Sequence, residues 1–231
     1  MFYWNPQYLL YMAPAMLLMF AAQWYVNSTY KKWGQVQSRS GISGLEAAQR
    51  IIRTGNLNEL AIHQIPGQLT DHYDPRKTEL SLSANVYQGS SIASLAIAAH
   101  ELGHAQQDQE GYFPLRLRSM LVPAVNIGST LGWILIMAGL VLNMLGIAWL
   151  GVFAFSGGAI FALATLPVEL NASARAKVLL RNSGIITSSD EERGVNQVLN
   201  AAALTYVASL FTAVMQLLYW VSIVGGGRRR R

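Results

Sequence analysis

The stretch of sequence that decides the fold is SMLVPAVNIGSTLGWILIMAGLVLNMLGIAWLGVFAFSGGAIFALATLPV, residues 119–168. It contains no Asp, Glu, Lys or Arg. A bilayer core is crossed by about 20 apolar residues in a helix. A single helix of this length would run about 75 Å, at 1.5 Å per residue, which is too long for one crossing. The stretch therefore predicts two membrane-spanning helices that turn near residues 143–146.

Two further stretches outside this pair carry no charged residue, 1–30 and 194–227. The whole chain is 13% charged, against roughly 25% in a soluble domain. The buried core helices of a soluble protein rarely run this long without a charge. The first stretch lacks the basic start and small-residue cleavage site of a signal peptide, so we expect it to be retained. We predict four crossings, at about 8–26, 121–142, 146–166 and 201–224.

Local patterns in the polar segment between the first two spans predict a small mixed structure. Ser43 and Glu46 form a capping box that opens a helix ending near Gly55. Alternating Leu and polar residues at 79–83 predict a strand, which is either an edge that pairs with an extended substrate or a strand buried within a small sheet. An Ala- and Leu-rich helix is expected over 92–107.

That last helix carries the run Ala99-His100-Glu101-Leu102-Gly103-His104-Ala105. Residues four apart project from one helix face, about 6 Å apart along the axis. Two imidazoles at this spacing can bind one zinc ion, and Glu101 beside them can act as the general base toward a zinc-activated water. The glycine at 103 faces away from the metal and allows another element to approach. We therefore predict that His100 and His104 bind Zn²⁺.

The third ligand of a catalytic zinc must come from elsewhere in the chain. The chain has no cysteine, so only His, Asp or Glu can serve. No histidine lies six residues after His104, where the chain has Glu110. Glu169 is the best candidate, because it is the one acid between Gly111 and Ser189 and lies where a span ends. Pro167 suggests that a helix begins just before it, so the alternative is an ordinary acid near a helix start. His63 and His72 also remain.

In this order along the chain, several runs resemble the YugP-like family of bacterial membrane proteins, which is described as neutral zinc metallopeptidases. They are Gly67-Gln-Leu-Thr-Asp-His-Tyr-Asp-Pro75, Leu80-Ser-Leu-Ser83, Val86-Tyr87, Ala98-Ala-His-Glu-Leu-Gly-His-Ala-Gln106 and Pro167-Val-Glu-Leu-Asn-Ala-Ser-Ala-Arg-Ala176. The family is more distantly similar to membrane proteases of the HtpX type, whose third ligand is a glutamate that opens a later helix. This resemblance supports Glu169. Those relatives have an aspartate four residues after the glutamate, where this chain has Ser173. If the contact that this aspartate makes to a metal ligand is kept, Ser173 or a neighbouring residue must make it in another way.

Two residues near this motif set leave alternatives open. His72, between Asp71 and Asp74, is a candidate catalytic residue that could stabilise an oxyanion, or part of an ordinary turn in which aspartates bond backbone amides. Arg175 either pairs with a carboxylate near the site or meets lipid headgroups.

The sequence as a whole predicts a mainly α fold, a four-helix transmembrane bundle with a small α+β zincin-like catalytic domain that carries the HExxH helix. The expected parts are a first transmembrane helix (1–30), the zincin-like catalytic region (31–118), a transmembrane hairpin (119–168), a helix with the third zinc ligand (169–200), and a fourth transmembrane helix with a basic tail (201–231).

The expected function is an integral-membrane zinc metalloendopeptidase of the bacterial plasma membrane. Its substrates would be membrane-associated proteins or peptides. The spans would contact the lipid bilayer. A catalytically silent zinc-binding scaffold is the alternative, and a metal transporter is disfavoured because the predicted spans lack Asp, Glu and His. Nucleic acid is not expected as a partner, because four of the 17 basic residues form the terminal run Arg228–Arg231. A membrane partner protein or an oligomer is left open. The remaining Lys and Arg are expected on the catalytic side, several of them close to the ends of spans, which favours a cytoplasmic site by the positive-inside rule.

Overall fold

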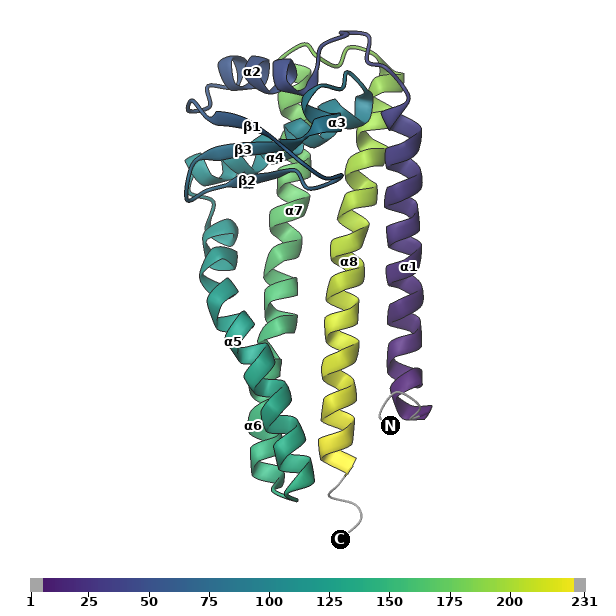
Figure 1. Cartoon of the computed structure of the whole chain (residues 1–231), viewed down its shortest axis with the longest axis vertical. Helices are drawn as coiled ribbons and strands as arrows, with labels where there is room; N and C mark the ends of the chain where they lie inside the picture. Colours follow the sequence, from purple (N-terminus) through teal and green to yellow (C-terminus); the bar gives the residue numbers. More distant parts are fainter. Residues whose placement is uncertain (1–5, 227–231) are drawn as a thin grey trace. The chain divides into compact units, whose positions relative to one another are not determined.

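The computed structural model describes residues 6–226 and is mainly helical, with one small sheet (Figure 1). Its elements, in chain order, are α1 (Pro6–Gly34), α2 (Gly44–Thr54), β1 (Ala61–Ile65), β2 (His72–Asp74), β3 (Glu79–Ser83), α3 (Ala84–Tyr87), α4 (Ile92–Gln109), α5 (Phe113–Val141), α6 (Leu145–Phe155), α7 (Gly157–Asn182) and α8 (Ser189–Gly226). The basic run Arg228–Arg231 lies outside the described residues.

The chain divides into two compact units. The first, here called the span unit, comprises Met1–Ala22, Arg116–Pro167 and Thr205–Arg231. The second, here called the sheet unit, comprises Gln23–Leu115 and Val168–Leu204. Helices α1, α5, α7 and α8 each contain residues of both units.

Four helical segments are long and apolar enough to cross a membrane, as the sequence predicted. They are Pro6–Gly34, Phe113–Val141, Leu145–Asn182 and Ser189–Gly226. Many large apolar side chains on them face outward, among them Leu10, Phe20, Met120 and Phe153, each at least 68% exposed. An apolar surface of this extent is typical of a protein that is covered by lipid.

Small residues allow close helix packing within the span unit. A Cβ atom added at Gly139 of α5 would lie 2.3 Å from the backbone nitrogen of Ala148 in α6. A Cβ atom added at Gly151 of α6 would lie 2.5 Å from the backbone nitrogen of Ile136 in α5. Small residues at such contacts are common between membrane helices, because they bring the backbones into van der Waals contact.

The sheet of the second unit has the strand order β1-β3-β2, with β1 parallel and β2 antiparallel to β3. The predicted strand Glu79–Ser83 is therefore confirmed as β3. Its interpretation as an edge strand that binds substrate is wrong, because β3 is the central strand and both of its edges are paired. The edges of the sheet are β1 and β2.

Helix α7 differs from the sequence prediction in where it begins. The expectation was that a new helix starts at Pro167, with Glu169 in its first turn. Instead α7 begins at Gly157 and continues through Pro167, so Glu169 lies in the middle of a helix. Proline is tolerated inside a helix in membrane proteins when neighbouring groups satisfy the freed carbonyl. The alternative role of Glu169 as an acid stabilised by a helix N-terminus is thereby excluded.

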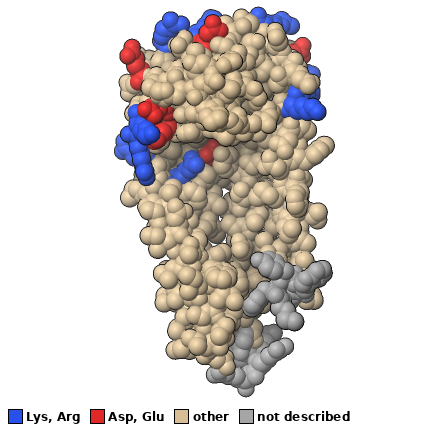
Figure 2. Space-filling view, in the orientation of Figure 1, with Lys and Arg blue, Asp and Glu red and all other residues tan. Residues whose placement is uncertain are grey.

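Charged side chains are concentrated in the sheet unit. Figure 2 shows Lys, Arg, Asp and Glu gathered over that part of the molecule. Among the described residues of the span unit, only Arg116 and Arg118 carry a charge. This division agrees with an apolar part in lipid and a polar part in water.

Candidate metal centre

Helix α4 is the central element of the site, and its start follows from the sequence. The helix begins at Ile92, as predicted, and the side chain of Ser91 caps it by accepting a hydrogen bond from the backbone nitrogen of Ser94. Ala98, Ala99 and Leu102 are fully buried in the core of the sheet unit. This burial fixes the rotation of the helix, so that the opposite side carries His100 and His104 toward α7.

Helix α7 can approach α4 closely because residue 103 is glycine. A Cβ atom at Gly103 would lie 2.5 Å from the carbonyl oxygen of Ala172 and 3.1 Å from its carbonyl carbon. Real Cβ atoms do not come this close to backbone atoms, so no other residue fits without a shift. The prediction that this glycine admits another element is confirmed, and α7 is that element.

Three ligand-type side chains converge where the two helices meet. The Nε2 atom of His100 lies 3.3 Å from Oε2 of Glu169, and Nε2 of His104 lies 3.4 Å from the same oxygen. The two imidazole rings are nearly perpendicular, with their centroids 4.9 Å apart. One ligand atom of each residue lies within 4.8 Å of the others. Glu169 is 2% exposed, so its carboxylate is held in a nearly dry environment.

These separations fit a zinc ion better than they fit hydrogen bonds alone. Charge-assisted hydrogen bonds from nitrogen to a carboxylate are usually about 2.7–2.9 Å long. Two ligand atoms on a tetrahedral zinc, each about 2.0–2.1 Å from the metal, are about 3.3 Å apart. The donor set of two imidazoles and one carboxylate is also that of a catalytic zinc site with one open position.

Each histidine is also contacted through its other ring nitrogen. Ser173 Oγ lies 3.3 Å from Nδ1 of His100, and Gln107 Oε1 lies 3.0 Å from Nδ1 of His104. Partners of this kind fix the ring orientation and the protonated nitrogen of a metal-binding histidine. In both rings this arrangement leaves Nε2 facing Glu169.

Glu101 lies next to the first histidine and is held by the sheet. The backbone N–H of Tyr73, in the edge strand β2, donates a hydrogen bond of 3.1 Å to Oε2 of Glu101. The Tyr73 hydroxyl donates to Asp108 of α4 at 2.9 Å, so one residue ties β2 to this helix twice. Burial raises the pKa of the Glu101 carboxyl, and the neighbouring His100 and His104 act in the opposite direction.

Comparison with known proteins identifies the family. Residues 8–225 match the model of a family described as "Putative neutral zinc metallopeptidase". The chain belongs to this family. It is also 44% identical, over 214 residues, to "Putative membrane protease YugP" of Bacillus subtilis (strain 168), and the match covers 93% of this chain and 95% of that protein. No solved structure matches the chain.

Not every residue that the sequence singled out reaches the group of His100, His104 and Glu169. His72 lies in β2, where its Nδ1 atom is 2.9 Å from the carbonyl oxygen of Thr70. Neighbouring strand residues point to opposite faces, so His72 points away from the face on which Tyr73 reaches α4. The expectation of a simple turn is wrong for His72–Asp74, which forms a strand.

The aspartates of that motif have structural partners. Asp71 accepts hydrogen bonds from the backbone nitrogen and the hydroxyl of Ser83, at 2.7 and 3.1 Å, and so joins the start of β2 to the end of β3. Asp74 accepts from the backbone nitrogen of Arg76, a local turn contact of the kind expected for aspartate.

Of the two roles expected for Arg175, the structure shows the pairing with a carboxylate. Its guanidinium forms a 2.7 Å ion pair with Glu110 and donates through Nε to Asn171 Oδ1, also at 2.7 Å. Sequence reasoning missed Asn171, Gln107 and Tyr73. The available signal was the position of Gln107 three residues after His104, which places the two side chains on one helix face.

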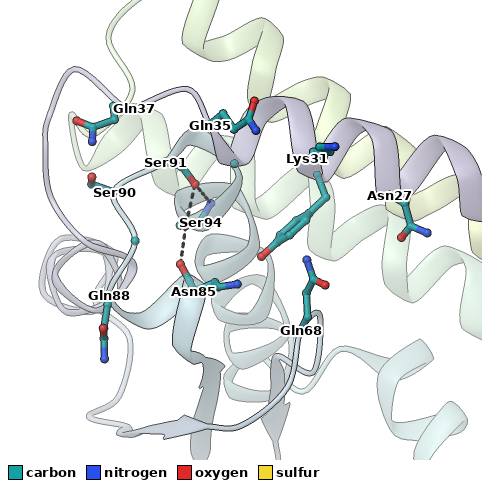
Figure 3. A pocket seen from close by; sticks show the side chains of 13 residues that line it. Asn27, Lys31, Gln35, Gln37, Gln68, Asn85, Gln88, Ser90, Ser91 and Ser94 are labelled. Carbon is teal, nitrogen blue, oxygen red and sulfur yellow. Dashed lines mark hydrogen bonds between the residues drawn. The ribbon is translucent and has the colours of Figure 1, made fainter.

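A pocket of the sheet unit lies apart from this site. It has a volume of about 730 Å³, and its lining includes Asn27, Lys31, Gln68 and Asn85 (Figure 3). Amide and hydroxyl groups predominate, and none of the three ligand-type residues lines it. The pocket is therefore separate from the group that His100, His104 and Glu169 form at the α4–α7 contact.

Proposed function

We propose that the chain is an integral-membrane zinc metalloendopeptidase in which His100, His104 and Glu169 bind the metal and Glu101 is the general base. The observation that carries this proposal is the convergence of three ligand atoms, at separations of 3.3 and 3.4 Å, beside the half-buried carboxylate of Glu101. Membership of the zinc metallopeptidase family supports the same reading.

The residues of the site divide the chemistry of peptide hydrolysis among them. Zinc, when bound, supplies Lewis-acid activation of the attacking water and of the peptide carbonyl. The N–H of Tyr73 holds one oxygen of Glu101, and the other oxygen is left to accept the proton of that water. Glu101 then delivers the proton to the leaving amine. This exchange needs a carboxylate whose orientation is fixed, which the hydrogen bond from β2 provides.

The sheet unit would then be a zincin-like catalytic region, interrupted in sequence by the hairpin of spans. Substrates would be proteins or peptides presented at the membrane. We infer a location in the bacterial plasma membrane, with the site on the cytoplasmic side, because all described Lys and Arg residues except Arg116 and Arg118 belong to the sheet unit.

The alternative is a scaffold that holds zinc without catalysis. A site that only stabilises the fold has no need of a base, and burying a carboxylate costs free energy. Glu101 is nevertheless half-buried beside the ligands and is held in place by a second element. This observation favours catalysis.

Purified wild type and Glu101→Gln protein in lipid vesicles provide the test, with zinc content and cleavage of a membrane-protein substrate as readouts. Loss of a positioned acid–base group costs about 10²–10⁴-fold in rate, so Glu101→Gln should keep its zinc and lose cleavage by that factor. Equal turnover by both proteins would contradict the proposed role, and absence of cleavage by the wild type on any substrate would favour the scaffold.

A further inference from the structure

Gln107 is a fully buried polar residue at the contact between α4 and α7. Its Nε2 atom donates to the carbonyl oxygen of Val168 at 2.8 Å and to Oδ1 of Asn171 at 2.9 Å. Its Oε1 atom lies 3.0 Å from Nδ1 of His104. A glutamine amide has two donors on one side and an acceptor on the other, so each side is used.

The surroundings allow only one orientation of this amide. The carbonyl of Val168 can only accept a hydrogen bond. Asn171 presents its oxygen, because Nε of Arg175 can only donate and is 2.7 Å from it. Arg175 is anchored in turn by its ion pair with Glu110. With two acceptors on one side, the nitrogen of Gln107 must face them and its oxygen must face His104.

The fixed orientation determines which nitrogen of His104 carries the proton. An amide oxygen cannot donate, so Nδ1 of His104 must be the donor across the 3.0 Å contact. In a neutral imidazole the other nitrogen, Nε2, then has a free lone pair. Nε2 is the atom that lies 3.4 Å from Glu169. The hydrogen-bonded chain from Glu110 through Arg175, Asn171 and Gln107 thus prepares His104 as a ligand.

We propose that Gln107 is a positioning residue for the metal site, which orients His104 and sets its tautomer, and that Asn171 and Arg175 hold Gln107 in the required orientation. This inference rests on the proposed function, because it assigns the residue a task only if His104 binds zinc. It goes beyond that function because it assigns His104 a partner, Gln107, which the sequence did not reveal.

Packing alone does not account for this residue. A buried amide costs free energy unless its groups are satisfied, and an apolar side chain of similar length would fill the same space. Gln107→Met removes the hydrogen bonds and keeps most of the volume. Gln106→Met is the matched control, because Gln106 precedes it in the same helix and makes no side-chain hydrogen bond within residues 6–226.

A second pair of variants tests the orientation of the amide without altering Gln107. Asn171→Asp keeps an oxygen that accepts from both Gln107 and Arg175. Asn171→Leu removes this acceptor. The zinc dissociation constant is measured by chelator competition on the full-length protein in detergent, and the apparent unfolding temperature of the zinc-free protein separates an effect on the metal from an effect on the fold.

Loss of such an outer partner typically weakens metal binding about 10–100-fold. We expect this loss for Gln107→Met, a smaller loss for Asn171→Leu, and near wild-type binding for Asn171→Asp and Gln106→Met, with similar unfolding temperatures for the zinc-free proteins. If Gln107→Met does not fold, the two Asn171 variants decide. Unchanged zinc affinity in Gln107→Met, or equal losses in Asn171→Asp and Asn171→Leu, would overturn the inference alone. A wild type that binds no zinc would overturn the proposed function itself.

Discussion

His100 and Glu169 are 69 positions apart in the sequence, and yet Nε2 of the first lies 3.3 Å from Oε2 of the second. The contact depends on two helices that meet at a glycine, and on a core that fixes the rotation of α4. Any change that separates α4 from α7 should therefore weaken metal binding more than it destabilises the rest of the fold.

Gly103→Ala tests this dependence. The new Cβ atom would lie 2.5 Å from the carbonyl oxygen of Ala172, a backbone atom that cannot turn away. Overpacking of this kind costs about 1–3 kcal/mol, so zinc affinity and the apparent unfolding temperature should both fall. Gly34→Ala is the control, because a Cβ there meets nothing within 4 Å. Equal behaviour of the two variants would show that the close approach is not required.

Ser173 is expected to act on the other histidine. Its hydroxyl lies 3.3 Å from Nδ1 of His100, at the position where the HtpX-type relatives have an aspartate. Ser173→Ala should weaken zinc binding by about 10-fold or more, whereas Ser173→Thr retains the hydroxyl and should bind almost normally. Chelator competition measures both. If alanine and threonine are equivalent, the hydroxyl has no part in holding His100.

A pH-dependent contribution to stability is expected from the capping box of α2. The backbone N–H of Ser43 donates to Oε2 of Glu46 at 2.7 Å, and hydrogen bonds from Ser43 hold the pKa of the Glu46 carboxyl below its ordinary value of 4.5. Because the pKa is lowered in the folded state, the contribution is present above pH 4.5 and is lost as the pH falls through the folded-state pKa.

Glu46→Gln should therefore lower the apparent unfolding temperature at neutral pH, and the difference from wild type should vanish at pH values below the folded-state pKa. Glu59→Gln, at an exposed glutamate in the loop after α2, is the control. A difference that persists unchanged into acid would mean that the charge of Glu46 is not the cause.

The absence of cysteine from the chain allows a direct test of sidedness. Single cysteines at Glu59 and Asn182 lie in the two polar segments, and one at Met144 lies in the connection between α5 and α6. In intact cells a membrane-impermeant thiol reagent should label Met144→Cys only. Labelling of Glu59→Cys but not Asn182→Cys would refute a shared side for the two polar segments, and labelling of both without Met144→Cys would reverse the orientation.

Local signals in the sequence predicted those elements whose ends are marked by their own residues. The capping box of Ser43 and Glu46 is present in the structure, and the helix expected from residue 92 begins at Ile92. The predicted start at Pro167 is wrong because the change from apolar to polar composition marks a change of surroundings, and the helix itself continues through it.

The sequence did not predict how the elements pack against one another. β2 has three residues, too few to show an alternating pattern, so the central position of β3 could not be anticipated. Gln106 and Gln107 look alike in the sequence, and only the packing of α4 against α7 shows that the second is fully buried. The spacing of His100 and His104 was sufficient to predict a pair of ligands, because one helix turn brings them together.

The central claim is that Glu169 completes a metal site with His100 and His104, and the metal content of purified protein tests it most directly. Zinc per chain is measured by mass spectrometry for wild type, Glu169→Ala and His72→Ala, after purification without chelators. We predict about one zinc in wild type and in His72→Ala, and little in Glu169→Ala, because two imidazoles alone leave a tetrahedral zinc site short of a protein ligand. Full zinc occupancy in Glu169→Ala together with loss in His72→Ala would contradict the claim and make His72 the third ligand.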